Sequence, residues 1–595
     1  MSFAKRVATC LAVTTAAVLA GAPSDAAVVR VPTQFRSFGN AVLAAAPGDT
    51  VQVVGNGGAT FHASDVHLDK DITIQGGWRA DFRVRDASTY VSVLRDTTNA
   101  NDRPILRILG TPRVVVDGVW IWGGQPGLVS GSGADVVLRN CTVRGQRNAD
   151  PSGSLDGNRG CGVRFVGGTV LVDGCHITDV ISQFGGAGMA VIGATSFILR
   201  NSALDGCQAN RPIGDASGGA LYVRDVPDMR LENTRIERSQ SLQAAGLVYL
   251  QNTSATMTGG TFQDGQASTN GGGFYLSGCP SVVLDQCQFL HNLANSQGGA
   301  IVAQSVGSLV IRDSRFQSNQ TGRASAHGLG SALWLSSTAF TIERTQFVGN
   351  HFDSPVVSVV AEQGGAVYAI SSSGTVSETS FTDEKALGKG GTWYQVGGDI
   401  RFIQCRFVGS QAGVFGGALA IELGGSSTFD HCLLAGGVAK FGGALSASFT
   451  GGLVLDHCTV TGNTARSAGA GFYVDTAATM RMTNTIACCC PAGEVVFCQG
   501  GAATADHCDV WNDDAVNVRV EWGGACPDPT GASGNLRVDP QFCPGDPDYH
   551  LAVGSPCAGT ASDGSDRGWR PAGCSLPSPT GVEPWSWGRL KALWR

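Results

Sequence analysis

A short glycine-rich motif recurs through most of this 595-residue chain at an almost constant interval. The motif is a Gly-Gly-Ala-like triplet followed by an apolar residue, and successive copies mostly lie 26 or 27 residues apart. Its third residue falls at Gly162, Gly188, Ala220, Gly246, Gly273, Ala300, Ala332, Ala366, Thr392, Ala418, Ala444 and Gly471. A second, apolar mark such as Phe289 follows after 15 or 16 residues. A fixed period of this length is typical of a solenoid, in which each repeat buries its apolar face against its neighbours.

The content of each repeat favours strands over helices. Helical repeats need long windows of 3.6-residue periodicity and good helix formers. Here short apolar runs are broken by Gly, Asn, Asp and Ser, and the chain holds 84 Gly and only 15% charged residues, which suits strands and tight turns. Parallel crossovers are almost always right-handed. The sequence therefore predicts an all-β, right-handed parallel β-helix of at least twelve regular coils, stacked about 4.8 Å apart.

The first residues carry the pattern of an export signal. Lys5 and Arg6 precede an apolar run that ends in Ala20-Gly-Ala22, which is typical of a Sec-type signal peptide and too short to span a membrane. Removing residues 1–22 leaves 18 of the 19 cysteines, an even number that suits disulfides outside the cell. A formal net charge of −7 makes nucleic acid an unfavourable partner. We expect a monomer, without a transmembrane segment, that is secreted or associated with the outer membrane or cell surface.

Composition divides the chain into segments. After the signal peptide (residues 1–22) we expect an N-terminal cap and irregular first coils (23–137), with a short helix near Phe38–Ala46 that covers the first sheet edge. Regular coils are predicted over 138–510, a Cys-rich C-terminal cap over 511–575, and a linker with a basic, aromatic tail over 576–595. Nine cysteines lie between Cys488 and Cys574, so disulfides are expected to staple this end.

Two local motifs resemble known secreted proteins. The pairing of Gly298-Gly-Ala-Ile301 with Phe316-Gln-Ser-Asn319 resembles the repeat of polymorphic outer membrane proteins, and more widely that of secreted right-handed parallel β-helix repeat proteins. Phe289–Asn292 and Phe347–Asn350 repeat the second half of the motif. The segment from Gly534 to Cys557 resembles the closing segment of many bacterial secreted β-helix proteins. The resemblance implies the fold and a surface location, but no single activity, because this fold hosts adhesins, lyases and hydrolases alike.

Two sets of residues predict ladders along the solenoid. Cys405, Cys432 and Cys458 occupy one position of three consecutive repeats, so stacking places their Cα atoms about 4.8 Å apart, a distance that a disulfide tolerates. Asn292 and Asn319 share another position in neighbouring repeats, where stacked amides can satisfy each other. Cys432, Cys458 and Cys508 each end an Asp-His-Cys triplet, but adjacent strand residues point to opposite faces. We therefore expect a structural ladder and neither a metal site nor a cofactor.

An outward-facing aromatic row is predicted just after the glycine triplet, at Tyr222, Tyr275, Trp334, Tyr368, Tyr394 and Tyr473. All four long insertions lie just before the triplet, so the loops emerge from one corner, which is often the binding face of repeat proteins. The last two insertions span 317–331 and 348–365. The predicted binding surface combines these loops with Trp334, Tyr368, Tyr394, His327, His351, Asp353 and Glu362. The alternative is an aromatic stack with a purely structural role.

Catalytic templates fit this chain poorly. A resemblance to β-helix polygalacturonases would require an Asn-Thr-Asp motif, which is missing, and Asp102–Arg107 only approximates the Arg motif of pectate lyases. We therefore predict no catalytic residues and an adhesin-like binding or structural module whose partner is a glycan or another cell-surface molecule. The alternative is an extracellular polysaccharide lyase or glycoside hydrolase of the pectin-lyase-like class. Carboxylates that converge in one groove would favour that enzyme.

Overall fold

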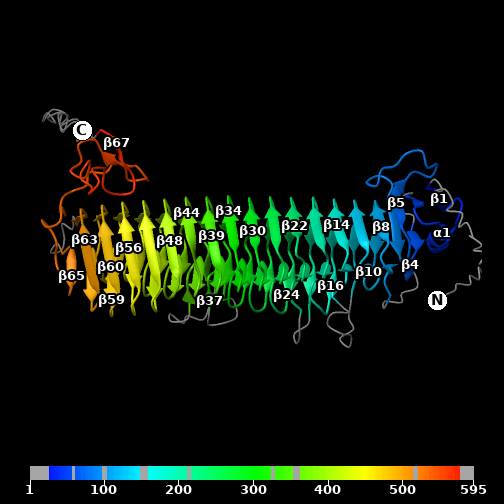
Figure 1. Ribbon diagram of the computed structural model, residues 1–595, viewed down its shortest axis with the longest axis horizontal. Helices are drawn as coiled ribbons and strands as arrows, with labels where there is room; N and C mark the ends of the chain where they lie inside the picture. The colour runs from blue at the N-terminus through cyan, green and yellow to red at the C-terminus, as the bar shows by residue number, and fades with distance from the viewer. Residues whose placement is uncertain are drawn as a thin grey trace, which may run out of the picture.

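The computed structural model describes residues 26–55, 60–96, 103–147, 159–210, 216–322, 328–352, 362–512 and 520–575. Over these ranges the chain forms one long right-handed parallel β-helix, with a helix at one end and a compact cap at the other (Figure 1). The predicted fold class is confirmed. The predicted signal peptide (1–22) and the tail (576–595) lie outside the described residues.

Four parallel sheets run along the solenoid. Within the described residues sheet A has 18 strands, sheets B and C have 17 each, and sheet D has 11 short ones. Their first and last strands are β1 (Val28–Val31) and β63 (Ala502–Asp506) in sheet A, β3 (Thr60–His62) and β64 (Asp509–Trp511) in sheet B, β4 (Val66–Leu68) and β65 (Trp522–Gly524) in sheet C, and β16 (Ile181–Ser182) and β58 (Thr464–Ala468) in sheet D.

A single coil visits the sheets in the order C, A, B, D. One example comprises β25 (Val248–Gln251), β26 (Ala255–Thr258), β27 (Thr261–Gln263) and β28 (Gln266–Ala267). The chain then re-enters sheet C as β29 (Phe274–Ser277), which pairs in parallel with β25 so that Val248 lies beside Phe274. The repeat period of the sequence is therefore the length of one coil.

Each corner of this coil carries one residue in the left-handed conformation. The φ angles are 49° at Asn252, 67° at Gly259, 54° at Asp264 and 68° at Gly271. Gly, and less readily Asn and Asp, adopts this conformation at low cost. The second glycine of the triplet is needed for a different reason, since a Cβ on Gly272 would lie 2.3 Å from the carbonyl oxygen of the next coil. The recurring Gly-Gly pair thus combines a turn with a close contact between coils.

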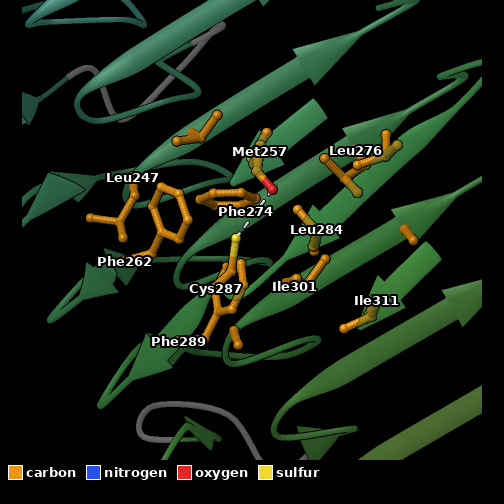
Figure 2. Close-up of a cluster of buried hydrophobic side chains, with 14 of the residues drawn as sticks. Leu247, Met257, Phe262, Phe274, Leu276, Leu284, Cys287, Phe289, Ile301 and Ile311 are labelled. Carbon is orange, nitrogen blue, oxygen red and sulfur yellow. Dashed lines mark hydrogen bonds between the residues drawn. The ribbon is translucent and has the colours of Figure 1, made fainter. Parts of the chain in front are cut away.

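The inward-facing rows form one continuous apolar core. Phe289, Phe316, Phe347 and Phe381 are fully buried, and neighbouring rings in this row lie 4.8 Å apart. Figure 2 shows a section in which Cys287 also points into the core, with its Sγ 3.6 Å from the carbonyl oxygen of Met257. Because burying one such side chain contributes about 1.5–3 kcal/mol, repetition of the row supplies much of the stability of the solenoid.

The N-terminal edge is covered by α1 (Phe38–Ala44). Ser37 caps this helix, with its Oγ accepting a hydrogen bond of 3.1 Å from the backbone N–H of Asn40. Its apolar face buries Phe38, Ala41 and Val42 against the first coil. The predicted capping helix is therefore confirmed, and it shields a sheet edge that would otherwise be open to pairing.

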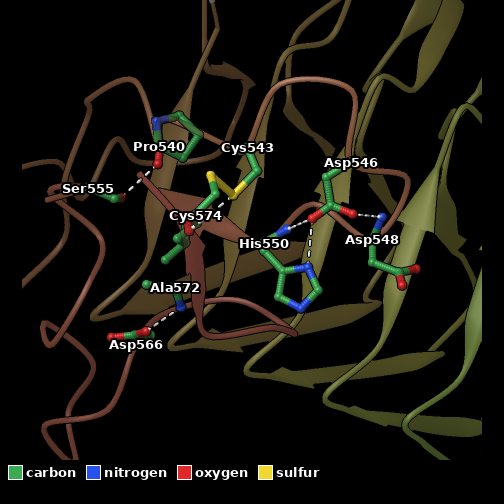
Figure 3. Close-up of a disulfide and its surroundings, with 10 residues drawn as sticks. Pro540, Cys543, Asp546, Asp548, His550, Ser555, Asp566, Ala572 and Cys574 are labelled. Carbon is green, nitrogen blue, oxygen red and sulfur yellow. Dashed lines mark hydrogen bonds and ion pairs between the residues drawn. A yellow bond between two sulfur atoms is a disulfide. The ribbon is translucent and has the colours of Figure 1, made fainter. Parts of the chain in front are cut away.

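The C-terminal cap is held by disulfides, as predicted. Cys498 of β62 (Val496–Gln499) pairs with Cys526, and Cys543 pairs with Cys574 of β67 (Ala572–Cys574). The second disulfide lies beside a loop in which Asp546 accepts hydrogen bonds from Asp548 and His550 (Figure 3).

The cap also folds back onto the outer face of sheet B. The backbone N–H of Trp569 donates to Thr459 Oγ1 at 3.1 Å, and Arg567 donates to the carbonyl oxygen of Cys508 at 2.8 Å. Arg406, further along the same sheet, forms an ion pair with Asp548. The cap therefore covers one side of the last coils in addition to their end.

Candidate functional site

The predicted aromatic row exists, but its rings are not freely exposed. Trp334 of β38 (Leu333–Ser336), Tyr368 of β43 (Val367–Ile370) and Tyr394 of β47 (Trp393–Val396) lie side by side in sheet C. Trp334 and Tyr368 are half-buried, whereas Tyr394 is only 4% exposed. The Tyr394 hydroxyl donates to Glu422 at 2.7 Å, and Glu422 also pairs with Lys389 at 2.7 Å. The expectation of an open strip is therefore wrong for Tyr394.

Further along the same row the rings cover one another. Tyr222 and Tyr249 stack with centroids 5.3 Å apart and planes 2° apart, and Tyr249 and Tyr275 stack at 5.4 Å and 10°. The guanidinium group of Arg159 lies 3.9 Å from the Tyr222 ring centroid. Sugar rings bind to the free faces of aromatic side chains, and the faces of Tyr222 and Tyr249 are already occupied. This packing favours the structural interpretation of the row.

Of the four polar residues predicted for this corner, the structure describes His351 and Glu362. His351 lies with Nδ1 2.9 Å from the carbonyl oxygen of Gly349 and Nε2 3.2 Å from the Gln320 amide. Glu362 is buried, and this burial raises its pKa to about 7 although the backbone N–H of Leu387 donates to it at 3.2 Å. Within the described residues, no hydrogen bond or ion pair joins His351 to Glu362. His327 and Asp353 lie outside the described residues.

The structure places the three ladder cysteines on consecutive coils. All three are fully buried free thiols. The backbone N–H of Cys405 donates to Cys432 Sγ at 3.4 Å, and the thiol of Cys458 donates to the carbonyl oxygen of Phe429 at 3.5 Å. Burial raises the pKa of Cys405 and Cys432 well above the usual thiol range. The neighbouring His431 side chain is 47% exposed, so histidine and cysteine of this triplet point apart.

The asparagines form a continuous buried ladder. Asn292 Nδ2 donates to Asn319 Oδ1 at 3.0 Å, and Asn319 Nδ2 donates to Asn350 Oδ1 at 2.9 Å. The ladder ends at Glu384, whose carboxyl group accepts from the side chain and the backbone N–H of Asn350. Burial raises the pKa of Glu384 well above its usual range. These residues satisfy one another and leave no group to face a ligand.

Within the described residues, three grooves lie on or beside the outer face of sheet B, and none of the three is lined by a residue of the predicted binding surface. The first groove has a volume of about 470 Å³ and lies between the cap and the coils, where Trp569 and Arg406 line it. The other two flank a single strand near the N-terminal end, β9 (Val119–Trp122). Val119 and Ile121 are fully buried, so alternation turns Trp120 and Trp122 outward.

The first of these two grooves has a volume of about 590 Å³ and contains Trp120. Its other lining residues are Arg85, Asp86, Ala87, Ser88, Val91, Asn140, Thr142 and Gly174. Arg85 is positioned by Asp117 at 2.9 Å and by the carbonyl oxygen of Gly76 at 3.0 Å. The groove thus combines one half-buried indole with hydroxyl, amide and guanidinium groups.

The second groove, of about 320 Å³, contains Trp122. It is lined further by Arg144, Gly145, Arg147, Asp179, Ile181, Gly206 and Gln208. Trp122 is 38% exposed. The guanidinium groups of Arg95 and Arg144 lie 4.9 Å and 5.4 Å from its ring centroid, within the range of cation–π attraction.

Carboxylates are sparse in these two grooves. Each is lined by one, Asp86 in the first and Asp179 in the second. The hydroxyl groups of Ser88 and Thr89 donate to Asp86 and lower its pKa to about 2, so this group stays ionised and is a poor proton donor. Among the residues that the structure describes, no cluster of three or more His, Cys, Asp or Glu side chains is arranged to hold a metal ion.

Residues 113–122 fall within the predicted irregular first coils, and neither tryptophan was among the predicted binding residues. The signal was present in the alternation of Val119-Trp-Ile-Trp122, since a strand with two apolar residues facing inward must turn both indoles outward. The arginines that flank them come from other coils, so no local pattern pointed to them.

Comparison with known proteins agrees with this architecture. The sequence matches the family model described as "Right handed beta helix region" over residues 105–347 and 210–406, which together span just over half of the chain. The chain belongs to the right-handed β-helix family. No curated protein matched the sequence. Among the residues that the structure describes, no α-helix is long and apolar enough to cross a membrane.

Proposed function

We propose that this β-helix protein is an adhesin-like, secreted or cell-surface module that binds glycans without cleaving them. The observation that carries the proposal is the groove around Trp120, where a half-buried indole lies among hydroxyl, amide and guanidinium groups. Apolar ring faces of sugars pack on aromatic side chains, while their hydroxyl groups need nearby donors and acceptors. The export-type N-terminus and the resemblance to polymorphic outer membrane protein repeats support a surface location.

The same groove argues against glycoside hydrolysis there. Both common mechanisms require two carboxyl groups on either side of the scissile bond, one of them with a raised pKa. The Trp120 groove is lined by one carboxylate, and its pKa is lowered. Glu362 does have a raised pKa, but it is buried away from the three grooves of sheet B.

Binding to a glycan array and turnover of polygalacturonate by the purified protein test the proposal. We expect binding without turnover, and Trp120→Ala should weaken it about tenfold or more, which corresponds to about 1.4 kcal/mol. Trp334→Ala is the matched control, because it removes a half-buried indole from the aromatic row of sheet C. Turnover of any glycan would overturn the proposal. Loss of binding in Trp334→Ala alone would move the site to the corner beside loops 317–331 and 348–365.

A further inference from the structure

We propose that the groove beside Trp122 is an anion-binding subsite that selects acidic glycans, with Arg95 and Arg144 binding carboxylate or sulfate groups of the sugar chain. This inference rests on the proposed function and adds the class of glycan. It concerns a different groove from the one that carries that proposal.

The three side chains form a preorganised stack on the outer face of sheet B. Arg95 of β6 (Ser92–Arg95), Trp122 of β9 and Arg144 of β12 (Thr142–Arg144) are in register on neighbouring strands. Because β6 and β12 flank β9, the two guanidinium groups approach the indole from opposite sides, at 4.9 Å and 5.4 Å. A guanidinium group stacked on a ring keeps its N–H edges free for paired hydrogen bonds to a planar anion.

Positive charge in this groove is only weakly neutralised. Arg144 lies 3.7 Å from Asp179, whose side chain is 63% exposed. Arg147, which lines the groove, and Arg95, which lies beside the groove on the other side of Trp122, are exposed and have no ion pair within the described ranges. The protein as a whole has a net charge of −7. The groove is therefore a local positive site on an acidic molecule, and such a site attracts anions to a defined place.

The spacing suits an extended chain with repeated charges. Arg95 and Arg144 lie two coils apart, which places their strands about 9.6 Å from each other. One small anion cannot pair with both guanidinium groups across the indole. A linear glycan with a charged group on successive units can, while its uncharged part lies near Trp120 on the same strand.

The stack also disfavours other ligands. Proteins bind single-stranded nucleic acid by stacking bases on free aromatic faces, and the guanidinium groups lie against both faces of Trp122. The same covering leaves no face for a neutral sugar. This groove must therefore distinguish acidic glycans from neutral ones by their charge.

The test compares polygalacturonate, a sulfated dextran, neutral dextran and single-stranded DNA as ligands of the purified protein. The variants are the double substitutions Arg95→Gln/Arg144→Gln and Arg95→Lys/Arg144→Lys. Arg481→Gln is the control, because it removes an exposed arginine from sheet A, far from the Trp122 groove. We expect at least one acidic glycan to bind more than tenfold more tightly than neutral dextran, with an affinity that falls as salt rises. The Gln variant should lose this preference, the Lys variant should keep part of it, and Arg481→Gln should keep all of it.

The outcomes separate the two proposals. If neutral glycans bind as tightly as acidic ones, the anion subsite is wrong and the glycan-binding function stands. If single-stranded DNA binds more tightly than both acidic glycans, or if Arg481→Gln is as damaging as the double Gln variant, the subsite is also wrong. If no glycan on the array or in this panel binds, both proposals fail. Polygalacturonate and sulfated dextran together show whether carboxylate or sulfate is preferred.

Discussion

The asparagine ladder offers a sharp test of what stabilises the solenoid from coil to coil. In Asn319→Ala, two buried donors of Asn292 lose their acceptor, because its backbone N–H and its Nδ2 both donate to Asn319 Oδ1, at 3.1 Å and 3.0 Å. Asn319 is fully buried, so water cannot replace the lost oxygen without opening the coil. Each unsatisfied buried donor costs about 1–3 kcal/mol. We expect local destabilisation of about 2–4 kcal/mol.

Hydrogen exchange is the appropriate assay, since a repeat protein opens locally and not as one unit. The amide of Asn292 should exchange at least about 30-fold faster in Asn319→Ala, the factor that corresponds to about 2 kcal/mol. The amide of Gly437 is an internal control, because it donates to Asn463 Oδ1 in a remote coil. Gln288→Ala is the control variant, as it truncates an exposed side chain in the coil of Asn292. Exchange at Asn292 that changes less than threefold would refute the argument that these amides stabilise the stack.

Two further predictions concern the predicted corner and the cap. Burial raises the pKa of Glu362 from 4.5 to about 7, so the native state binds this proton more tightly than the unfolded chain does. The contribution of the bound proton to the free energy of unfolding is complete below about pH 4.5 and is lost as the pH rises through 7. Glu362→Gln should therefore be more stable than the wild type at pH 8 by roughly 1–3 kcal/mol in urea denaturation, with no gain at pH 4; an equal effect at both values would contradict this. Replacing Cys543 and Cys574 together by Ser removes a disulfide that closes a segment of 31 residues, which should destabilise the cap by roughly 3–4 kcal/mol. Limited proteolysis should then cut the cap while the coils stay intact, and a cap as resistant as that of the wild type would show that its contacts with sheet B suffice.

The period of the sequence predicted the solenoid because each coil repeats the same local requirements. A residue in the left-handed conformation is needed at the corners, which favours Gly, Asn or Asp although Arg238 and His291 also adopt it. The close approach of coils selects a second glycine, as at Gly272. Alternation then fixes which side chains face inward, as at Phe316, which is fully buried. These features depend on residues close in sequence or on the equivalent residue one coil away. A single sequence is therefore enough to predict the coil and its inward-facing side chains.

Exposure of the outward-facing residues was decided by tertiary structure. Tyr394 and Trp122 both face outward by alternation, yet the first is 4% and the second 38% exposed. Tyr394 is covered because Lys389 and Glu422 pack around it, whereas Trp122 lies between the guanidinium groups of Arg95 and Arg144 and stays more exposed. Alternation assigns a direction to a side chain but says nothing of what lies above it.

The placement of the cap was likewise decided by tertiary contacts. The guanidinium group of Arg406 donates to the carbonyl oxygen of Pro547 across a separation of 141 residues. Cysteine content predicted a cap stapled by disulfides but not which cysteines pair. Contacts over such distances carry no periodic signal. The sequence by itself therefore determined the coil, its core and its stapled end. Only the tertiary structure decided which outward residues remain accessible, because accessibility depends on neighbours contributed by distant segments.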